Sequence, residues 1–200
     1  MIKILNIFAF LVLIHTTNGQ QPNAEYLELK KILLESNTEL IVEYHSDCIG
    51  SAFITLGEVG DCEYENPFYL FWIKEDKYYK RKFTNCGIFK VNEMAKSDFL
   101  ESVKENLKLI EKSEILPVIH KSKKTLEGGV AEETIIETEL SHYCESKFSF
   151  HTKSDKIEKS IIDYYLDTKM IDENTPNDNY ELNEKSILNT IFKLIEKETE

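Results

Sequence analysis

The sequence predicts an α+β fold in which about four helices pack on an antiparallel sheet of about five to seven strands, braced by two disulfides. Alternating apolar and polar side chains, typical of strands, mark 39–45 and the aromatic stretch 68–83. Apolar stripes at helical spacing mark 24–36, 97–112 and 183–195. Because strand and helix segments are grouped rather than regularly alternating, the sheet is expected to be antiparallel.

The first segment, residues 1–19, has the pattern of a cleavable secretory signal peptide. A positive start at Lys3 precedes an apolar run at 4–14, and the small residue Gly19 stands before the expected cut. This run is shorter than the about 20 residues that span a bilayer, which favours a signal peptide over a membrane-spanning helix. An uncleaved anchor is the alternative interpretation. Residues 20–200 are predicted to form one globular domain in a periplasmic or secreted, hence extracytoplasmic, location.

The negative net charge of the chain makes some classes of binding partner less favourable than others. The chain of 200 residues has a formal net charge of −12 at pH 7, and 42% of its residues are hydrophobic. An acidic surface repels phosphate backbones and anionic headgroups, so neither nucleic-acid binding nor membrane insertion after leader cleavage is expected. The charge is typical of a soluble acidic protein, and also suits an inhibitor of a basic target.

The four cysteines predict two disulfides, because an even count in an oxidising compartment favours full pairing. Three connectivities are open. A strand at 52–56 that pairs with the first hairpin strand would bring Cys62 and Cys86 to the same end of the sheet. The preferred connectivity is therefore Cys62–Cys86 with Cys48–Cys144.

The aromatic hairpin at 68–83 turns at either Glu75-Asp76 or Asp76-Lys77. The first turn would place two lysines opposite one another, which costs free energy through like charge. The second sets Arg81 across from Trp72, a cation–π geometry. We therefore expect the Asp76-Lys77 turn.

Either turn gives the hairpin the same two faces, because side chains alternate along a strand. One face is predicted to be core and gathers Phe68, Leu70, Trp72, Tyr79, Arg81 and Phe83. The other is a candidate partner-binding face, and gathers Tyr69, Phe71, Ile73, Tyr78, Lys80 and Lys82. Aromatic rings beside ammonium groups bind glycans, carboxylates or partner loops. The alternative is that a helix such as 187–195 covers the rings while the lysines point outward.

Local signals divide the middle of the chain. Small and turn-forming residues predict a turn at 46–50, and a short strand is expected at 88–91. Ser97 is a favourable N-cap for a helix that ends at Lys112. The polar run 121–127 is read as a loop.

The C-terminal third combines strand and helix signals. Residues 134–152 are predicted to form one bent strand or two short ones. Asp155 with Glu158 resembles a capping pair and predicts a helix start. A polar loop is expected at 167–179, after which Asn183 is predicted to cap the last helix.

No residue is nominated as catalytic, and neither a metal site nor a cofactor is predicted. A zinc site would need His45 with Cys48 and His142 with Cys144, and paired cysteines are not ligands. The same pairing removes Cys48 as a nucleophile. With 36 acidic residues, chance carboxylate pairs are too many to choose among.

The predicted function is a small secreted or periplasmic binding or interaction protein, such as an inhibitor or accessory protein. Its expected partner is a protein or a glycan, bound by the sheet face or by the loops around 57–67 and 121–131. The alternative is a secreted hydrolase that uses acidic residues the sequence does not identify.

Overall fold

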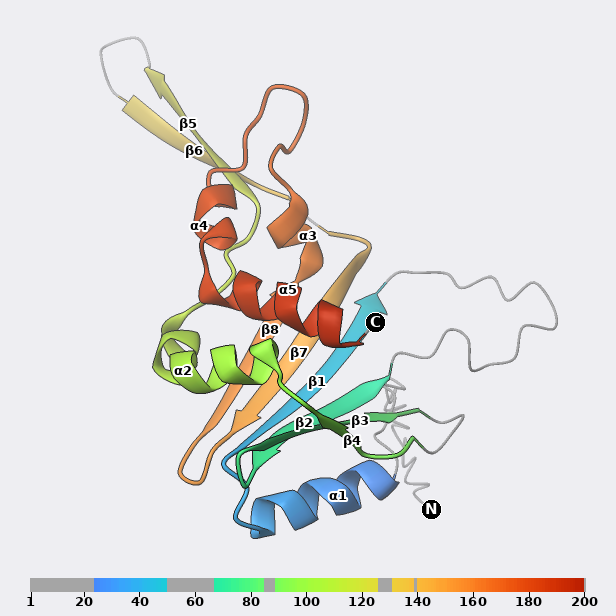
Figure 1. The fold of residues 1–200 in the computed structure, drawn as a ribbon. Helices are drawn as coiled ribbons and strands as arrows, with labels where there is room; N and C mark the ends of the chain where they lie inside the picture. The colour runs from blue at the N-terminus through green and yellow to red at the C-terminus, as the bar shows by residue number, and fades with distance from the viewer. Residues whose placement is uncertain (1–23, 50–66, 85–88, 126–130, 139, 200) are drawn as a thin grey trace, which may run out of the picture.

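The computed structural model describes residues 24–49, 67–84, 89–125, 131–138 and 140–199. In these ranges a six-stranded antiparallel sheet carries helices on both faces, and a separate two-stranded hairpin extends from one end (Figure 1). The predicted α+β class is confirmed. The expected signal peptide and the expected strand at 52–56 lie outside the described residues. No helix in the described ranges is long and apolar enough to cross a membrane.

The sheet has the strand order β4-β3-β2-β1-β7-β8. Its strands are β1 (Leu40–Ile49), β2 (Phe68–Lys74), β3 (Lys77–Phe83), β4 (Asn92–Met94), β7 (Tyr143–His151) and β8 (Lys156–Ile162). The separate hairpin consists of β5 (Ile119–Thr125) and β6 (Ala131–Glu137). The helices are α1 (Ala24–Glu35), α2 (Asp98–Lys112), α3 (Asp163–Asp167), α4 (Tyr180–Glu184) and α5 (Ile187–Thr199).

Strand β1 lies at the centre and separates two cores, because its side chains alternate between the faces of the sheet. Helices α2 and α5 cover one face, on which Leu40, Val42 and Tyr44 are buried. Helix α1 lies on the opposite face (Figure 1), where Ile41 joins a smaller cluster. That smaller cluster consists of Tyr26, Leu33, Ile41, Leu70, Trp72 and Phe83.

The helical stripes predicted from spacing largely pack as expected. Ser97 caps α2 by accepting a hydrogen bond from the backbone N–H of Leu100 at 3.1 Å. The stripe of α5 is buried against the sheet at Leu188, Ile191, Phe192 and Ile195. In α1, however, the predicted stripe residue Ile32 is 54% exposed.

The turn of the aromatic hairpin is Glu75-Asp76, so the expected Asp76-Lys77 turn is wrong. Both turn residues have positive φ, 54° and 58°, the conformation that matches the twist of two-residue hairpins. Lys74 does stand opposite Lys77. The repulsion is offset because the ammonium of Lys77 lies 3.0 Å from the carboxylate of Glu93 on β4. The two predicted faces of the hairpin are unchanged.

Arg81 consequently does not face Trp72. It pairs across the strands with Leu70, and its guanidinium lies 4.9 Å from the ring centre of Phe83. It also donates to the carboxylate of Glu25 on α1 at 2.5 Å, so it ties that helix to the sheet.

Long-range strand pairing overrides three local predictions. The expected turn at 46–50 is wrong up to Ile49, because β1 pairs with β7 from Ile41 to Ile49. The polar run at 121–127 is not a loop where it is described, because β5 pairs with β6. The expected strand at 88–91 is replaced by β4, at Asn92–Met94.

The C-terminal third agrees with the prediction only in part. Residues 134–152 contribute to two strands, as one of the two alternatives had it, but these strands, β6 and β7, belong to different sheets. Asp155 and Glu158 do not open a helix, because the segment that follows is the edge strand β8. Its apolar residues Ile157 and Ile161 are four apart, a spacing that also places two side chains on one face of a strand.

Asn183 lies inside α4 rather than at the start of α5, and it connects three segments. Its carbonyl oxygen accepts from Leu116 N–H at 2.8 Å, and its amide donates to the carbonyls of Leu116 at 2.8 Å and Tyr165 at 3.1 Å. Asn183 is 1% exposed. It is therefore a buried structural residue.

Asn183→Ala is expected to lower the free energy of unfolding by about 2–3 kcal/mol, because it leaves buried backbone groups without partners. Urea unfolding of the purified protein measures the change. Asn174→Ala, on an exposed loop, is the matched control and should stay within about 0.5 kcal/mol of the parent. Equal effects of the two variants would contradict a structural role for Asn183.

Candidate functional site

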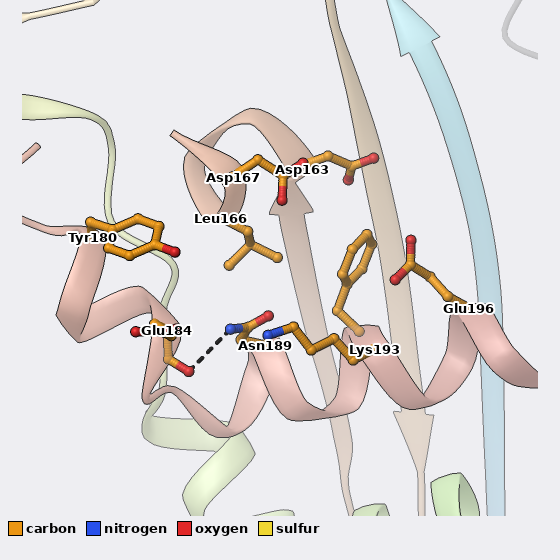
Figure 2. A pocket seen from close by; sticks show the side chains of 9 residues that line it. Asp163, Leu166, Asp167, Tyr180, Glu184, Asn189, Lys193 and Glu196 are labelled. Carbon is orange, nitrogen blue, oxygen red and sulfur yellow. Dashed lines mark hydrogen bonds between the residues drawn. The ribbon is translucent and has the colours of Figure 1, made fainter. Parts of the chain in front are cut away.

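A pocket of about 220 Å³ lies where α3, α4 and α5 meet (Figure 2). Its lining combines four carboxylates with one lysine, a tyrosine and an asparagine, over an apolar floor. The lining residues are Asp163, Leu166, Asp167, Tyr180, Glu184, Asn189, Phe192, Lys193 and Glu196. They come from three segments that tertiary packing brings together.

Two walls of the pocket are formed by α3 and α5, and the position of each helix follows from the chain around it. Strand β8 ends at Ile162, and the chain continues directly into α3 with Asp163 as its first residue. On α5 the buried stripe holds one side of the helix against the sheet. Asn189, Lys193 and Glu196 follow one another at i, i+4 and i+7, so they share the adjacent polar flank of α5. Figure 2 shows this flank opposite Asp163 and Asp167.

The third wall comes from α4. The Asn189 amide donates to the backbone carbonyl of Glu184 at 3.0 Å, which joins α5 to the end of α4 (dashed in Figure 2). Tyr180 begins α4 and presents its ring to the pocket. The ammonium of Lys169 lies 5.9 Å from the centre of that ring.

Among the carboxyl groups that line the pocket, Asp163 has a raised pKa. Its Oδ1 atom is buried and has no hydrogen-bond partner. Burial raises the pKa of the Asp163 carboxyl to about 6, and the negative charges of Glu196 and Asp167 act in the same direction. Asp163 can therefore hold a proton at mildly acidic pH, whereas an ordinary aspartate is ionised there.

Tyr44 of β1 lies close enough to the pocket for the carboxylates of Asp163 and Glu196 to affect its pKa. Burial is the main cause that raises the pKa of Tyr44, and the charges of Asp163 and Glu196 add to it. Its hydroxyl lies 3.5 Å from Ser146 Oγ on β7. The hydroxyl groups of Tyr44 and Ser146 therefore lie on the sheet near these carboxylates.

A broader and shallower hollow of about 600 Å³ lies between the end of β6, the start of β7 and α3. Tyr143 and Tyr165 line it, with Glu137 as its one carboxylate. Because it is more open and less charged, it offers a ligand fewer converging groups than the pocket around Asp163.

The candidate partner-binding face on the hairpin is covered. Tyr69, Phe71 and Ile73 are buried in the core under α2 and α5. Tyr78 packs against this core, and its hydroxyl donates to the carboxylate of Glu101 on α2. The sheet face expected to bind a partner is thus mainly packing surface, as the alternative interpretation had it.

The two lysines of that face are also engaged. The ammonium of Lys80 donates to the carbonyl of Glu198 at 2.6 Å, so it binds the last turn of α5. The ammonium of Lys82 lies 5.3 Å from the centre of the Phe89 ring.

The predicted disulfide Cys48–Cys144 is present and joins directly opposed residues of β1 and β7. The second predicted disulfide, Cys62–Cys86, lies outside the described residues. His45 and Cys48 are three apart on one strand, so they point to opposite faces and do not converge. Among the described residues, no group of three or more His, Cys, Asp or Glu side chains is arranged to hold a metal ion.

The sequence did not identify the pocket because its residues lack a motif. The polar flank of α5 and the pair Asp163 and Asp167, four residues apart, were the available signals. Both patterns also occur on ordinary solvent-exposed helices. In addition, the helix predicted to start at Asp155 put Asp163 inside a helix, whereas Asp163 follows strand β8 and begins α3.

Comparison with known proteins adds no relative: no protein-family model matches the chain, and neither a curated protein nor a solved structure shows significant similarity to it.

Proposed function

We propose that this protein is an extracytoplasmic binding protein that takes a small organic cation, such as an alkylammonium group, into the pocket between α3, α4 and α5. The observation that carries the proposal is the lining of the pocket, which gathers four carboxylates around one lysine and includes Asp163, whose buried Oδ1 atom has no hydrogen-bond donor. A cation bound in the pocket would compensate the negative charge of these groups.

The size and lining of the pocket support a small amine. Its volume of about 220 Å³ is below the range of about 300–1,000 Å³ of pockets for drug-sized ligands. The apolar floor of Leu166 and Phe192 can hold a short alkyl chain, and the Tyr180 ring offers a cation–π contact. A bound ammonium placed near Asp163 and Glu196 would interact with both carboxylates.

The extracytoplasmic location rests on the predicted signal peptide and on the disulfide, which is typical of oxidising compartments. We place a small ligand before the protein or glycan partner expected from the sequence, because the sheet face expected to bind that partner is covered by α2 and α5. Of the two loops expected to bind it, residues 57–66 and 126–130 lie outside the described residues. Secreted material is expected to begin at Gln20, and protein that stays in the cytoplasm with residues 1–19 attached would contradict the location.

Titration calorimetry at pH 7 with n-butylammonium chloride tests the proposal. We expect a Kd of about 1 mM for so small a ligand, and no binding of the neutral isostere 1-butanol. Asp163→Asn should weaken binding at least about tenfold, because one charge of the site is lost. Glu181→Gln is the matched control, since its carboxylate lies outside the pocket and pairs with Lys185 at 3.1 Å. Equal binding of the alcohol, or no binding of the amine, would refute the proposal.

One observation favours the hydrolase alternative as a second candidate. A carboxyl with a pKa of about 6 beside the carboxylate of Glu196 resembles an acid–base pair. Under this candidate, Asp163 would protonate a leaving group and Glu196 would activate water. Turnover of aryl glycosides that is lost in both Asp163→Asn and Glu196→Gln would favour it; turnover that survives both variants would exclude these two residues.

A further inference from the structure

We propose that a cation enters this pocket in exchange for the proton held by Asp163, so that ligand affinity is controlled by pH in the weakly acidic range. This inference rests on the proposed function. It concerns regulation of the same site and follows from the burial and surroundings of a single carboxyl group.

The surroundings of Asp163 contain more negative than positive groups. The titratable groups that face or line its site come from four elements: Asp167 on α3, Tyr180 and Glu184 on α4, Lys193 and Glu196 on α5, and Tyr44 on β1. Lys193 is the one cation among these described residues, and no ion pair within 4.0 Å joins its ammonium to a carboxylate in the described ranges. Among the described lining residues, the protein therefore places more negative than positive charge around Asp163.

The buried Oδ1 atom also lacks a donor that would stabilise the ionised form. A carboxylate is usually held ionised by N–H or O–H donors or by a nearby cation. Burial and the charges of Glu196 and Asp167 instead raise the pKa of Asp163 to about 6. Without a bound cation, Asp163 is therefore mainly protonated below that pH.

A bound ammonium opposes the raised pKa of Asp163, because it places a positive charge beside the carboxyl group and stabilises its ionised form. The exchange is balanced: the ammonium enters with one positive charge, and one proton leaves Asp163 for the solvent. The ligand itself keeps its own proton, since the pKa of an alkylamine is about 10. Below the pKa of Asp163, binding should therefore release about one proton per cation.

Calorimetry with n-butylammonium at pH 5 and pH 7, in pairs of buffers with different ionisation heats, tests the exchange. We expect a Kd about tenfold weaker at pH 5 than at pH 7, with about 0.9 proton released at pH 5 and about 0.1 at pH 7. Asp163→Asn should remove the pH dependence, whereas Glu181→Gln should retain it. Binding of equal affinity at both pH values, without proton release, would overturn the exchange and leave the proposed function standing.

A measurement without ligand separates the two proposals further. Carboxyl-carbon NMR of the free protein should show Asp163 titrating near pH 6, and a midpoint near 4 would overturn the exchange alone. Absence of amine binding at both pH values overturns the proposed function and the exchange together.

The stability of Asp163→Asn provides a third readout. A carboxyl whose folded pKa is raised from 3.8 to about 6 favours folding most below the lower value, and this contribution is lost as pH rises through the higher one. The variant should therefore gain more in Tm, relative to the parent, at pH 7 than at pH 5. A gain that does not depend on pH would count against a proton held by Asp163.

Discussion

Cys48→Ser/Cys144→Ser is expected to lower the free energy of unfolding by about 4–5 kcal/mol. The disulfide joins residues 96 apart in sequence, and closing a loop of this length removes much of the conformational entropy of the unfolded chain. The bond also connects β1 to β7 near one end of their paired region. Loss of the disulfide leaves the strand pairing in place but increases the conformational entropy of the unfolded chain.

Urea unfolding of the double variant and the parent measures this change. Lys147→Gln is the control on β7, because its side chain is 53% exposed and pairs with Glu145 at the surface. That control should cost less than about 1 kcal/mol. A double variant that loses no more than the control would show that the chain-entropy account fails for this bond.

Glu43→Ala is expected to cost about 3–5 kcal/mol, because it leaves several donors unpaired in a partly buried network. The Glu43 carboxylate accepts hydrogen bonds from the hydroxyl of Tyr26 and the ring of His151, and lies 2.8 Å from the ammonium of Lys30. Two of these partners belong to α1. The variant should therefore loosen the attachment of α1 to the sheet.

The pH dependence of this contribution has a definite sign. Burial alone would raise the pKa of Glu43, but the hydrogen bonds from His151, Lys30 and Tyr26 outweigh it and lower the pKa from 4.5 to about 2. Glu43 therefore stabilises the fold fully above pH 4.5, and its contribution is lost as pH falls toward 2. The difference in unfolding free energy between the parent and Glu43→Gln should shrink over this interval.

Glu39→Ala provides the control for Glu43. Glu39 immediately precedes β1 and also pairs with a lysine, Lys104 at 2.9 Å, but both side chains are exposed. Its replacement should cost less than about 1 kcal/mol. Similar losses for the two variants would contradict the role given to the buried network.

Local signals were sufficient where a single segment determines its own structure. The cap at Ser97 and the stripes of α2 and α5 are visible in the sequence, because a helix satisfies its hydrogen bonds within one segment. The faces of the hairpin follow from alternation alone. Strands β5 and β8 were missed, because their residues become strands only through a partner elsewhere in the chain.

Less of the candidate site than of the fold could be predicted from the sequence. Exposure of Tyr69 and Phe71 could not be read from alternation, because α2 and α5 decide which sheet face is covered. The turn at Glu75-Asp76 depended on Glu93, a residue of another strand that compensates Lys77. Charge compensation from a distant segment was the missing information in that case.

By itself, the sequence determined the α+β class, three of the helices and the two hairpin faces, since each depends on local periodicity. It left three disulfide connectivities open, and the structure selects the pairing of Cys48 with Cys144. Tertiary structure alone decided the pocket around Asp163. Its walls come from residues 163–167, 180–184 and 189–196, and the burial that raises the pKa of Asp163 exists only once these segments have packed together.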